Sequence, residues 1–114
     1  MLRMRAEALK GHLDGLLLAS LEAGPLHGYA VIEALRDGSS GRFDLPTGTV
    51  YPALHRLEAA GLVESGWSVV SGRRRRTYEL TPAGRRALND QRTIWDEFSD
   101  AVNVLLRPKR GAAT

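Results

Sequence analysis

The chain has 114 residues, of which 43% are hydrophobic and 25% charged, and its formal net charge is +3. A chain of this length buries one hydrophobic core, so we expect a single domain. The absence of cysteine excludes disulfide bonds, thiolate nucleophiles and cysteine-ligated metal sites, and favours a cytoplasmic location. The longest apolar run, residues 16–19, is far shorter than the ~20 residues of a membrane-spanning helix, and the N-terminus does not resemble a signal peptide. We therefore expect no membrane partner.

Two helices are predicted in the first third of the chain. Residues 6–23 carry leucines at helical spacing, and Gly24 and Pro25 end the pattern. These leucines are Leu9, Leu13, Leu16, Leu17 and Leu21. Leu18 lies off this stripe, which predicts a second buried face. The next helix is predicted over residues 27–36, before a glycine- and serine-rich loop.

A third helix is predicted from Pro46 to the residue before Gly61, with either Thr47 or Thr49 as its cap. Val50, Leu54 and Leu57 recur at helical spacing and are expected to face the core. Side chains that donate and accept hydrogen bonds lie on the opposite side and are free to bind a polar partner. They are Thr47, Thr49, Tyr51, His55 and Arg56.

Two strand-like runs follow, at residues 67–70 and 75–80. Ser71, Gly72 and a block of four arginines join them, and this block, Arg73, Arg74, Arg75 and Arg76, extends into the second run. The pattern predicts a β-hairpin with a basic tip. Tyr78 and Leu80 alternate with polar residues, so one face of the hairpin is expected to pack on the helices.

The last predicted helix starts at Thr81 and Pro82 and continues to about Arg107. A largely apolar and aromatic stripe recurs along it in steps of three and four. Its members are Leu88, Gln91, Trp95, Phe98, Val102 and Leu105, of which Gln91 is polar. A monomer of this size has little surface left to cover such a stripe, which predicts a homodimer interface. The domain prediction is a compact unit over residues 6–80, a dimerisation helix over residues 81–107 and a disordered tail over residues 108–114.

Charge is unevenly distributed along the chain. Residues 65–86 contain six arginines and one acidic residue, whereas residues 87–106 contain one arginine and four acidic residues. A local arginine patch beside a helix with a polar face is typical of a protein that binds the phosphates of nucleic acids.

Three helices followed by a two-stranded wing describe a mainly α-helical, winged helix-turn-helix fold. The sequence itself resembles the PadR family of bacterial transcriptional regulators. The resemblance depends on the combination of GPLHGY at residues 24–29, GTVYPALHRLE at residues 48–58, GRRR at residues 72–75 and YELTPAG at residues 78–84. Pro46, Thr47 and Val50 depart slightly from the family pattern. The single C-terminal helix is similar to that of the short-form PadR subgroup, which dimerises through it.

The resemblance implies a sequence-specific regulator, a ligand-responsive repressor that binds an inverted-repeat operator as a homodimer at the nucleoid. In such a protein the wing arginines contact phosphates and the third helix contacts bases. Tyr51 is ambiguous, because its ring could pack inward and leave only the hydroxyl near a phosphate. Tyr29 resembles a family position close to the DNA backbone, and the sequence does not separate that role from a role in the core.

The resemblance also implies an effector site. In short-form PadR regulators a cavity at the dimer centre takes flat aromatic compounds, and Trp95 matches the tryptophan that flanks it. Leu13, Leu16, Phe98 and Ser99 are the predicted walls, and a planar aromatic or cationic molecule is the predicted ligand. The alternative interpretation is that Trp95 and Phe98 simply form the closed core of the dimer.

Other classes of function have little support in the sequence. His12, His27 and His55 lie on three different predicted helices, so we expect no metal site and no cofactor. No pattern of an activated nucleophile or of a phosphate-binding loop is present, so we expect no enzyme activity. The alternative function is a winged-helix module that binds a protein partner and no DNA.

Overall fold

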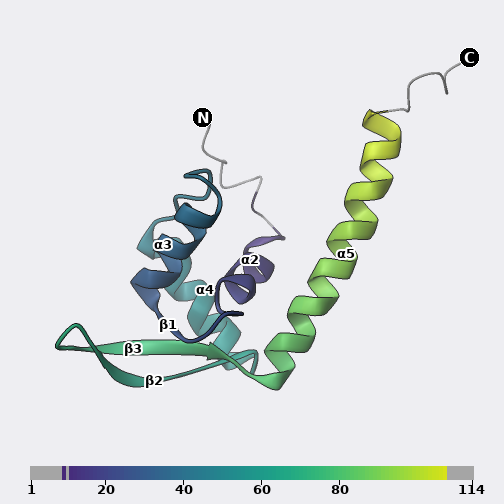
Figure 1. The fold of residues 1–114 in the computed structure, drawn as a ribbon. Coiled ribbons are helices and arrows are strands. Elements are labelled where there is room, and N and C mark those ends of the chain that lie inside the picture. Colours follow the sequence, from purple (N-terminus) through teal and green to yellow (C-terminus); the bar gives the residue numbers. More distant parts are fainter. Residues whose placement is uncertain (1–8, 10, 108–114) are drawn as a thin grey trace, which may run out of the picture.

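The computed structural model describes residue 9 and residues 11–107 of the chain. Its elements are α2 (Leu13–Ser20), β1 (Leu26–His27), α3 (Gly28–Gly38), α4 (Thr47–Ala59), β2 (Val63–Val70), β3 (Arg73–Leu80) and α5 (Pro82–Leu106). Figure 1 shows α2, α3 and α4 grouped on one side of the β2–β3 hairpin, and α5 extending as a long arm beside α2. The predicted fold class, a mainly helical winged helix with one C-terminal helix, is confirmed. The predicted tail at residues 108–114 lies outside the described residues.

The first predicted helix is shorter in the structure than the sequence pattern suggested. Within residues 11–23 the helical part is α2, which begins at Leu13 and ends at Ser20. A turn precedes it, because Gly11 has a φ of 85°, in the left-handed region that favours glycine. The leucines of the predicted stripe also differ in burial. Leu17 and Leu21 are buried, whereas Leu13 and Leu16 are only partly buried.

The first turns of α3 and α4 differ from the prediction in their caps. His27 caps α3, because its Nδ1 accepts a hydrogen bond from the backbone N–H of Ala30 at 3.3 Å. The prediction that a threonine caps α4 is wrong. Pro46 is the cap residue, and only its backbone carbonyl takes part, accepting from the N–H groups of Thr49 and Val50.

The sheet has three strands rather than the two that were predicted, in the order β1-β3-β2. The two-residue strand β1 pairs with β3 through Leu26 opposite Tyr78. The arginine block lies beside the hairpin turn rather than in it. The hairpin turn consists only of Ser71 and Gly72, with φ values of 52° and 78°, which are typical of a tight two-residue turn. Arg73–Leu80 is all strand, so the four arginines lie within β3.

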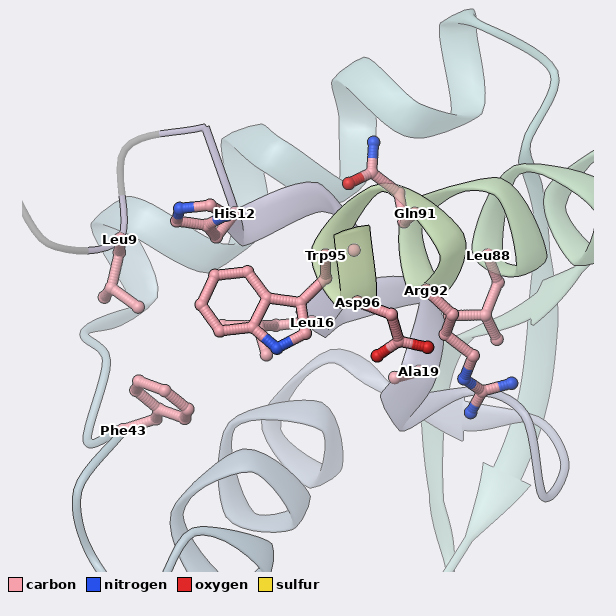
Figure 2. Close-up of a pocket in the computed structure, with 11 residues that line it drawn as sticks. Leu9, His12, Leu16, Ala19, Phe43, Leu88, Gln91, Arg92, Trp95 and Asp96 are labelled. Atoms are coloured by element: carbon pink, nitrogen blue, oxygen red, sulfur yellow. The ribbon is translucent and has the colours of Figure 1, made fainter. Parts of the chain in front are cut away.

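Helix α5 follows β3 without a loop. Thr81 caps it by accepting a hydrogen bond from the N–H of Gly84 at 3.0 Å, and the Thr81 hydroxyl donates to the carbonyl of Gly61 at 2.7 Å. Figure 2 shows Trp95 of α5 beside Leu16 of α2, and a Cβ atom built on Gly15 of α2 would lie 3.5 Å from Cβ of Gln91. The start of α5 therefore belongs to the body of the domain.

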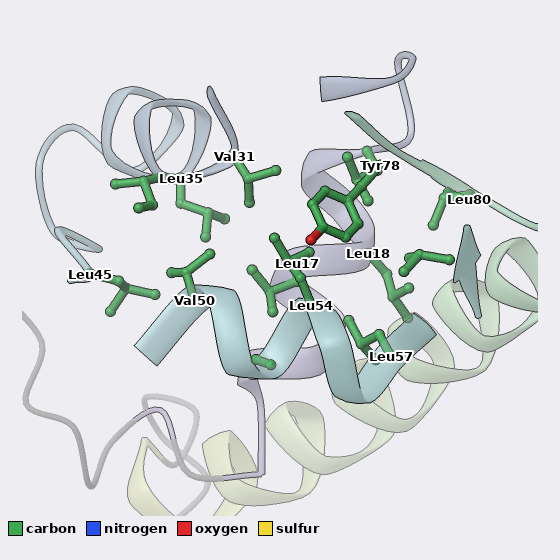
Figure 3. Close-up of a cluster of buried hydrophobic side chains, with 14 of the residues drawn as sticks. Leu17, Leu18, Val31, Leu35, Leu45, Val50, Leu54, Leu57, Tyr78 and Leu80 are labelled. Atoms are coloured by element: carbon green, nitrogen blue, oxygen red, sulfur yellow. The ribbon is translucent and has the colours of Figure 1, made fainter. Parts of the chain in front are cut away.

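The core lies between the three N-terminal helices and the sheet. Figure 3 shows Leu17 and Leu18 of α2 close to Leu54 of α4, with Tyr78 of β3 at one side. Leu18 is 2% exposed, which confirms the predicted second buried face of this helix. The residues expected to point inward from α4 are buried as well, namely Val50, Leu54 and Leu57. This packing fixes α4 against the sheet and so defines the position of its polar side relative to the hairpin.

Candidate nucleic-acid interface

A groove of about 300 Å³ lies where α4, the start of α3 and the hairpin meet. Its lining residues are His27, Gly28, Tyr29, Tyr51, His55, Trp67, Arg74, Arg75, Arg76 and Tyr78. Six of the ten residues predicted to contact DNA therefore lie in one groove. The other four, Thr47, Thr49, Arg56 and Arg73, are exposed and lie outside its lining.

Tyr51 owes its position to a glycine on the neighbouring helix. A Cβ atom built on Gly28 would lie 2.6 Å from Cε1 of Tyr51, so only glycine lets the ring approach the first turn of α3 this closely. The Tyr51 side chain nevertheless remains 37% exposed. The ring thus packs between the two helices while part of the side chain stays available to a partner.

Arg56 is oriented away from the groove. Its guanidinium donates a hydrogen bond to the carboxylate of Asp14 on α2, and the two side chains form an ion pair. Arg56 and His55 are neighbours in sequence, but they lie on different sides of α4: His55 lines the groove and Arg56 contacts Asp14. A DNA contact by Arg56 would compete with the Asp14 carboxylate.

A polar network joins the groove face of α4 to the hairpin. Glu58 of α4 accepts a hydrogen bond from the Ser65 hydroxyl at 2.5 Å, and its carboxylate lies 3.9 Å from the guanidinium of Arg76. The Tyr78 ring is buried beneath this network, and burial raises the pKa of the Tyr78 hydroxyl. The hydroxyl therefore stays protonated and neutral at physiological pH. The contacts of Glu58 with Ser65 and Arg76 hold the base of the β2–β3 hairpin against α4.

Trp67 is a groove residue that sequence reasoning did not select. Its side chain is 60% exposed and lies beneath two guanidinium groups, those of Arg74 and Arg76. The position of a tryptophan opposite an arginine block was visible in the sequence. The pairing of Trp67 with Arg76 depends on the register of the hairpin, and the sequence analysis did not predict that register.

A second, larger cavity of about 670 Å³ lies between α2 and α5 (Figure 2). Its lining residues are Leu9, His12, Gly15, Leu16, Ala19, Phe43, Leu88, Gln91, Arg92, Trp95 and Asp96. Among the predicted effector residues, Leu16 and Trp95 line this cavity, and Leu13, Phe98 and Ser99 do not. Phe98 lies next to a lining residue, because the centre of its ring is 6.2 Å from the centre of the Trp95 ring.

The stripe along α5 is buried at one end and open at the other. Leu88 is 3% exposed and belongs to the core of its own chain. Trp95, Phe98 and Leu105 are 51%, 57% and 80% exposed. Ile94 is also exposed on this arm. The outer part of α5 therefore presents an apolar surface that no residue of the described chain covers fully.

Residues 9 and 11–107 contain no group of three or more histidine, aspartate or glutamate side chains arranged to hold a metal ion. Among the helices of these residues, none combines the length and hydropathy needed to span a membrane.

Comparison with known proteins identifies the family. The family model described as "Transcriptional regulator PadR-like family" matches residues 17–90. A transcriptional regulator of Mycobacterium tuberculosis is 54% identical over 55 residues, which cover 48% of this chain and 51% of that protein. The match thus spans about half the length of this curated relative.

Solved structures show the same fold. The crystal structure of a PadR family transcriptional regulator from Eggerthella lenta is similar with a TM-score of 0.77 and 32% identity, covering 90% of this chain and 88% of that one. Bacillus subtilis PadR in complex with operator DNA is similar with a TM-score of 0.62 and 22% identity, covering 69% of this chain and 45% of that one. Because the family model extends from α2 into α5, this chain belongs to the PadR-like family of transcriptional regulators, which are not enzymes.

Proposed function

We propose that this regulator binds double-stranded DNA in a sequence-specific manner, as a homodimeric repressor. The observation that carries the proposal is the groove between α4 and the hairpin, where three arginines of β3 lie next to Tyr51 and His55. Arginines supply the charge that phosphates require, and hydrogen-bonding side chains on an exposed helix supply contacts to base edges. The similar B. subtilis PadR structure, which contains operator DNA, supports the same use of this fold.

The groove geometry favours a division of roles. In the proposal, Arg73, Arg74, Arg75 and Arg76 contact phosphates, and Tyr29 at the start of α3 contacts the DNA backbone. Base contacts come from the exposed side of α4, through Thr47, Thr49, Tyr51, His55 and Arg56. Of these, Arg56 must exchange its Asp14 partner for DNA, so its contribution is expected to be smaller than that of His55.

Dimerisation in this proposal uses the outer part of α5. Trp95, Phe98 and Leu105 are large, apolar and exposed, and Gln91 and Val102 lie on the same side of the helix. A second copy covers this surface and forms a two-fold interface. Two-fold symmetry then gives an inverted-repeat operator with half-site centres about one helical turn of DNA apart.

The α2–α5 cavity supports regulation by a ligand. Its aromatic wall includes Trp95 and Phe43, and its charged lining residues are Asp96 and Arg92, of which Arg92 is paired with Glu22. A planar aromatic molecule, or a planar cation, suits this combination. Such an effector releases DNA only if it binds the DNA-free arrangement of the dimer more tightly than the DNA-bound one. A change in the angle between the two α5 helices would couple the cavity to the DNA contacts.

Selection of duplexes from a random-sequence library, followed by gel-shift titration, tests the proposed function. We expect enrichment of an inverted repeat and binding that weakens steeply with salt. A scrambled duplex of equal length is the control for sequence specificity. If no duplex is enriched and none is retarded at low salt, the chain does not act through DNA, and the protein-binding alternative replaces the proposal.

A further inference from the structure

Trp67 is unusual among the groove residues, because it is large, aromatic and mostly exposed. It was not among the residues predicted to contact DNA. The guanidinium carbon of Arg74 lies 4.9 Å from the centre of the Trp67 ring, and that of Arg76 lies 5.6 Å from it. Both distances are within the ~6 Å range of a cation–π interaction. One ring therefore holds two of the four wing cations.

The register of the hairpin explains why only two arginines contact the ring. Trp67 pairs with Arg76, and Val69 pairs with Arg74, so these four side chains share one face of the sheet. By the alternation of the strand, Arg73 and Arg75 belong to the opposite face, although Arg75 still contributes to the lining of the groove. The block of four arginines is thus two pairs in different environments.

The two arginines that contact the ring are held to different extents. Arg76 has a second partner, the Glu58 carboxylate at 3.9 Å. For Arg74 the structure gives only the contact with the Trp67 ring among the described residues. The position of Arg74 therefore depends more strongly on Trp67 than that of Arg76 does.

From this geometry we infer that Trp67 is a positioning residue for DNA binding, which holds the Arg74 guanidinium in place for a backbone phosphate on the groove side of the wing. The inference rests on the proposed function. A free arginine side chain loses rotamer freedom when it binds, and the ring removes part of that cost before the DNA arrives. Trp67 acts through Arg74 and does not itself contact a base.

The test is a double-mutant cycle on a duplex that the wild-type protein has selected from a random library, with gel-shift affinities as the readout. We expect Trp67→Leu, which changes no charge, to weaken binding about twofold to fivefold per half-site. We expect Arg74→Ala to weaken it more, because it also removes a phosphate contact, and to lower the salt dependence by about one unit per half-site. The Trp67→Leu/Arg74→Ala protein should bind almost as well as Arg74→Ala alone, since the ring then has little left to position.

Arg73→Ala is the matched control, because it removes the same charge from the adjacent position on the opposite face. Its effect should multiply with that of Trp67→Leu. Trp67→Phe, which keeps an aromatic ring, should recover part of the lost affinity. The thermal midpoints of all these variants should equal that of the wild type, because the side chains are exposed.

Three results would overturn the inference. They are an unchanged affinity of Trp67→Leu, independent effects of Trp67→Leu and Arg74→Ala, and equal coupling of Trp67 to Arg73 and Arg74. Each leaves the proposed function intact if the wild-type protein binds the selected duplex and Arg74→Ala weakens that binding. A wild-type protein that selects no duplex refutes the proposed function itself.

Discussion

Gly84, in the first turn of α5, packs directly on the backbone of Leu62: a Cβ atom built on Gly84 would lie 1.9 Å from the Leu62 carbonyl oxygen. That oxygen already accepts a hydrogen bond from the N–H of Thr81. The absence of a side chain at Gly84 therefore lets α5 start against the segment between α4 and β2. The junction between α5 and the hairpin depends on this close approach.

We expect Gly84→Ala to lower the free energy of unfolding by about 1–3 kcal/mol, because the methyl group meets a backbone atom that cannot rotate away. Chemical denaturation of the purified protein measures this. Gly48→Ala is the control, since a Cβ atom at Gly48 meets nothing within 4 Å and alanine favours a helix. Equal stability of Gly84→Ala and the wild type would show that α5 does not pack as described.

Tyr51 offers a way to separate packing from DNA contact. Tyr51→Phe keeps the ring beside Gly28 and removes only the hydroxyl, so we expect unchanged stability and a loss of about 0.5–1.5 kcal/mol in DNA binding. Gly28→Ala displaces the ring and should weaken both properties. Thermal melts and gel-shift titrations of the two variants measure the difference. A Tyr51→Phe protein with wild-type affinity would limit Tyr51 to packing.

An ion pair between α5 and the turn that follows α2 makes stability sensitive to acid. Arg92 donates two hydrogen bonds of 2.7 Å to Glu22, and they hold the pKa of the Glu22 carboxyl below its ordinary value. A carboxyl whose pKa is lowered by folding stabilises the fold above its unfolded pKa, and this contribution is lost as the pH falls through the folded pKa. We expect the thermal midpoint of the wild type to fall more than that of Glu22→Gln between about pH 5 and about pH 3. Parallel curves would mean that the pair contributes nothing to stability.

The outer part of α5 should control the oligomeric state. Phe98→Glu introduces a charge into the exposed apolar surface, and we expect it to convert a dimer into a monomer without unfolding the protomer. Sedimentation or light scattering at micromolar concentration measures the change. Asn103→Glu adds the same charge on another side of α5 and should leave the dimer intact. A wild-type protein that is already monomeric at these concentrations contradicts the proposed dimer.

The effector proposal predicts a fluorescence response of Trp95. In a Trp67→Phe background, where Trp95 is the remaining tryptophan, planar cationic dyes should quench the emission in a saturable manner and release bound DNA. Trp95→Ala should abolish the release. If no compound in such a panel quenches Trp95, the cavity has a structural role.

The helices and their inward faces were predictable because helical periodicity is a local property of the sequence. Val50, Leu54 and Leu57 repeat within a few residues, and burial follows the repeat. The same reasoning identified Thr81 and Pro82 as the start of α5, because the capping interaction joins residues three apart.

Features that depend on distant partners were not predictable in this way. Strand β1 has two residues and exists because Leu26 meets Tyr78, which lies far along the chain. Arg56 was assigned to the DNA face, and its Asp14 partner belongs to another helix. Trp67 was overlooked because its significance appears only when the hairpin register brings Arg74 and Arg76 over its ring.

The loop-free connection at Thr81 also has a mechanical consequence. Helix α5 has 25 residues and is about 37 Å long, and its first turn is hydrogen-bonded to the carbonyl of Gly61 at the end of α4. In the proposed dimer, where the far ends of the two α5 arms are fixed to each other, each arm would act as a lever that carries α4 at its other end. A tilt of about 5° over this length gives a displacement of about 3 Å, close to the rise of about 3.4 Å per base pair. In the proposed dimer on DNA, a rotation of a few degrees would therefore shift α4 by about one base-pair step along a duplex.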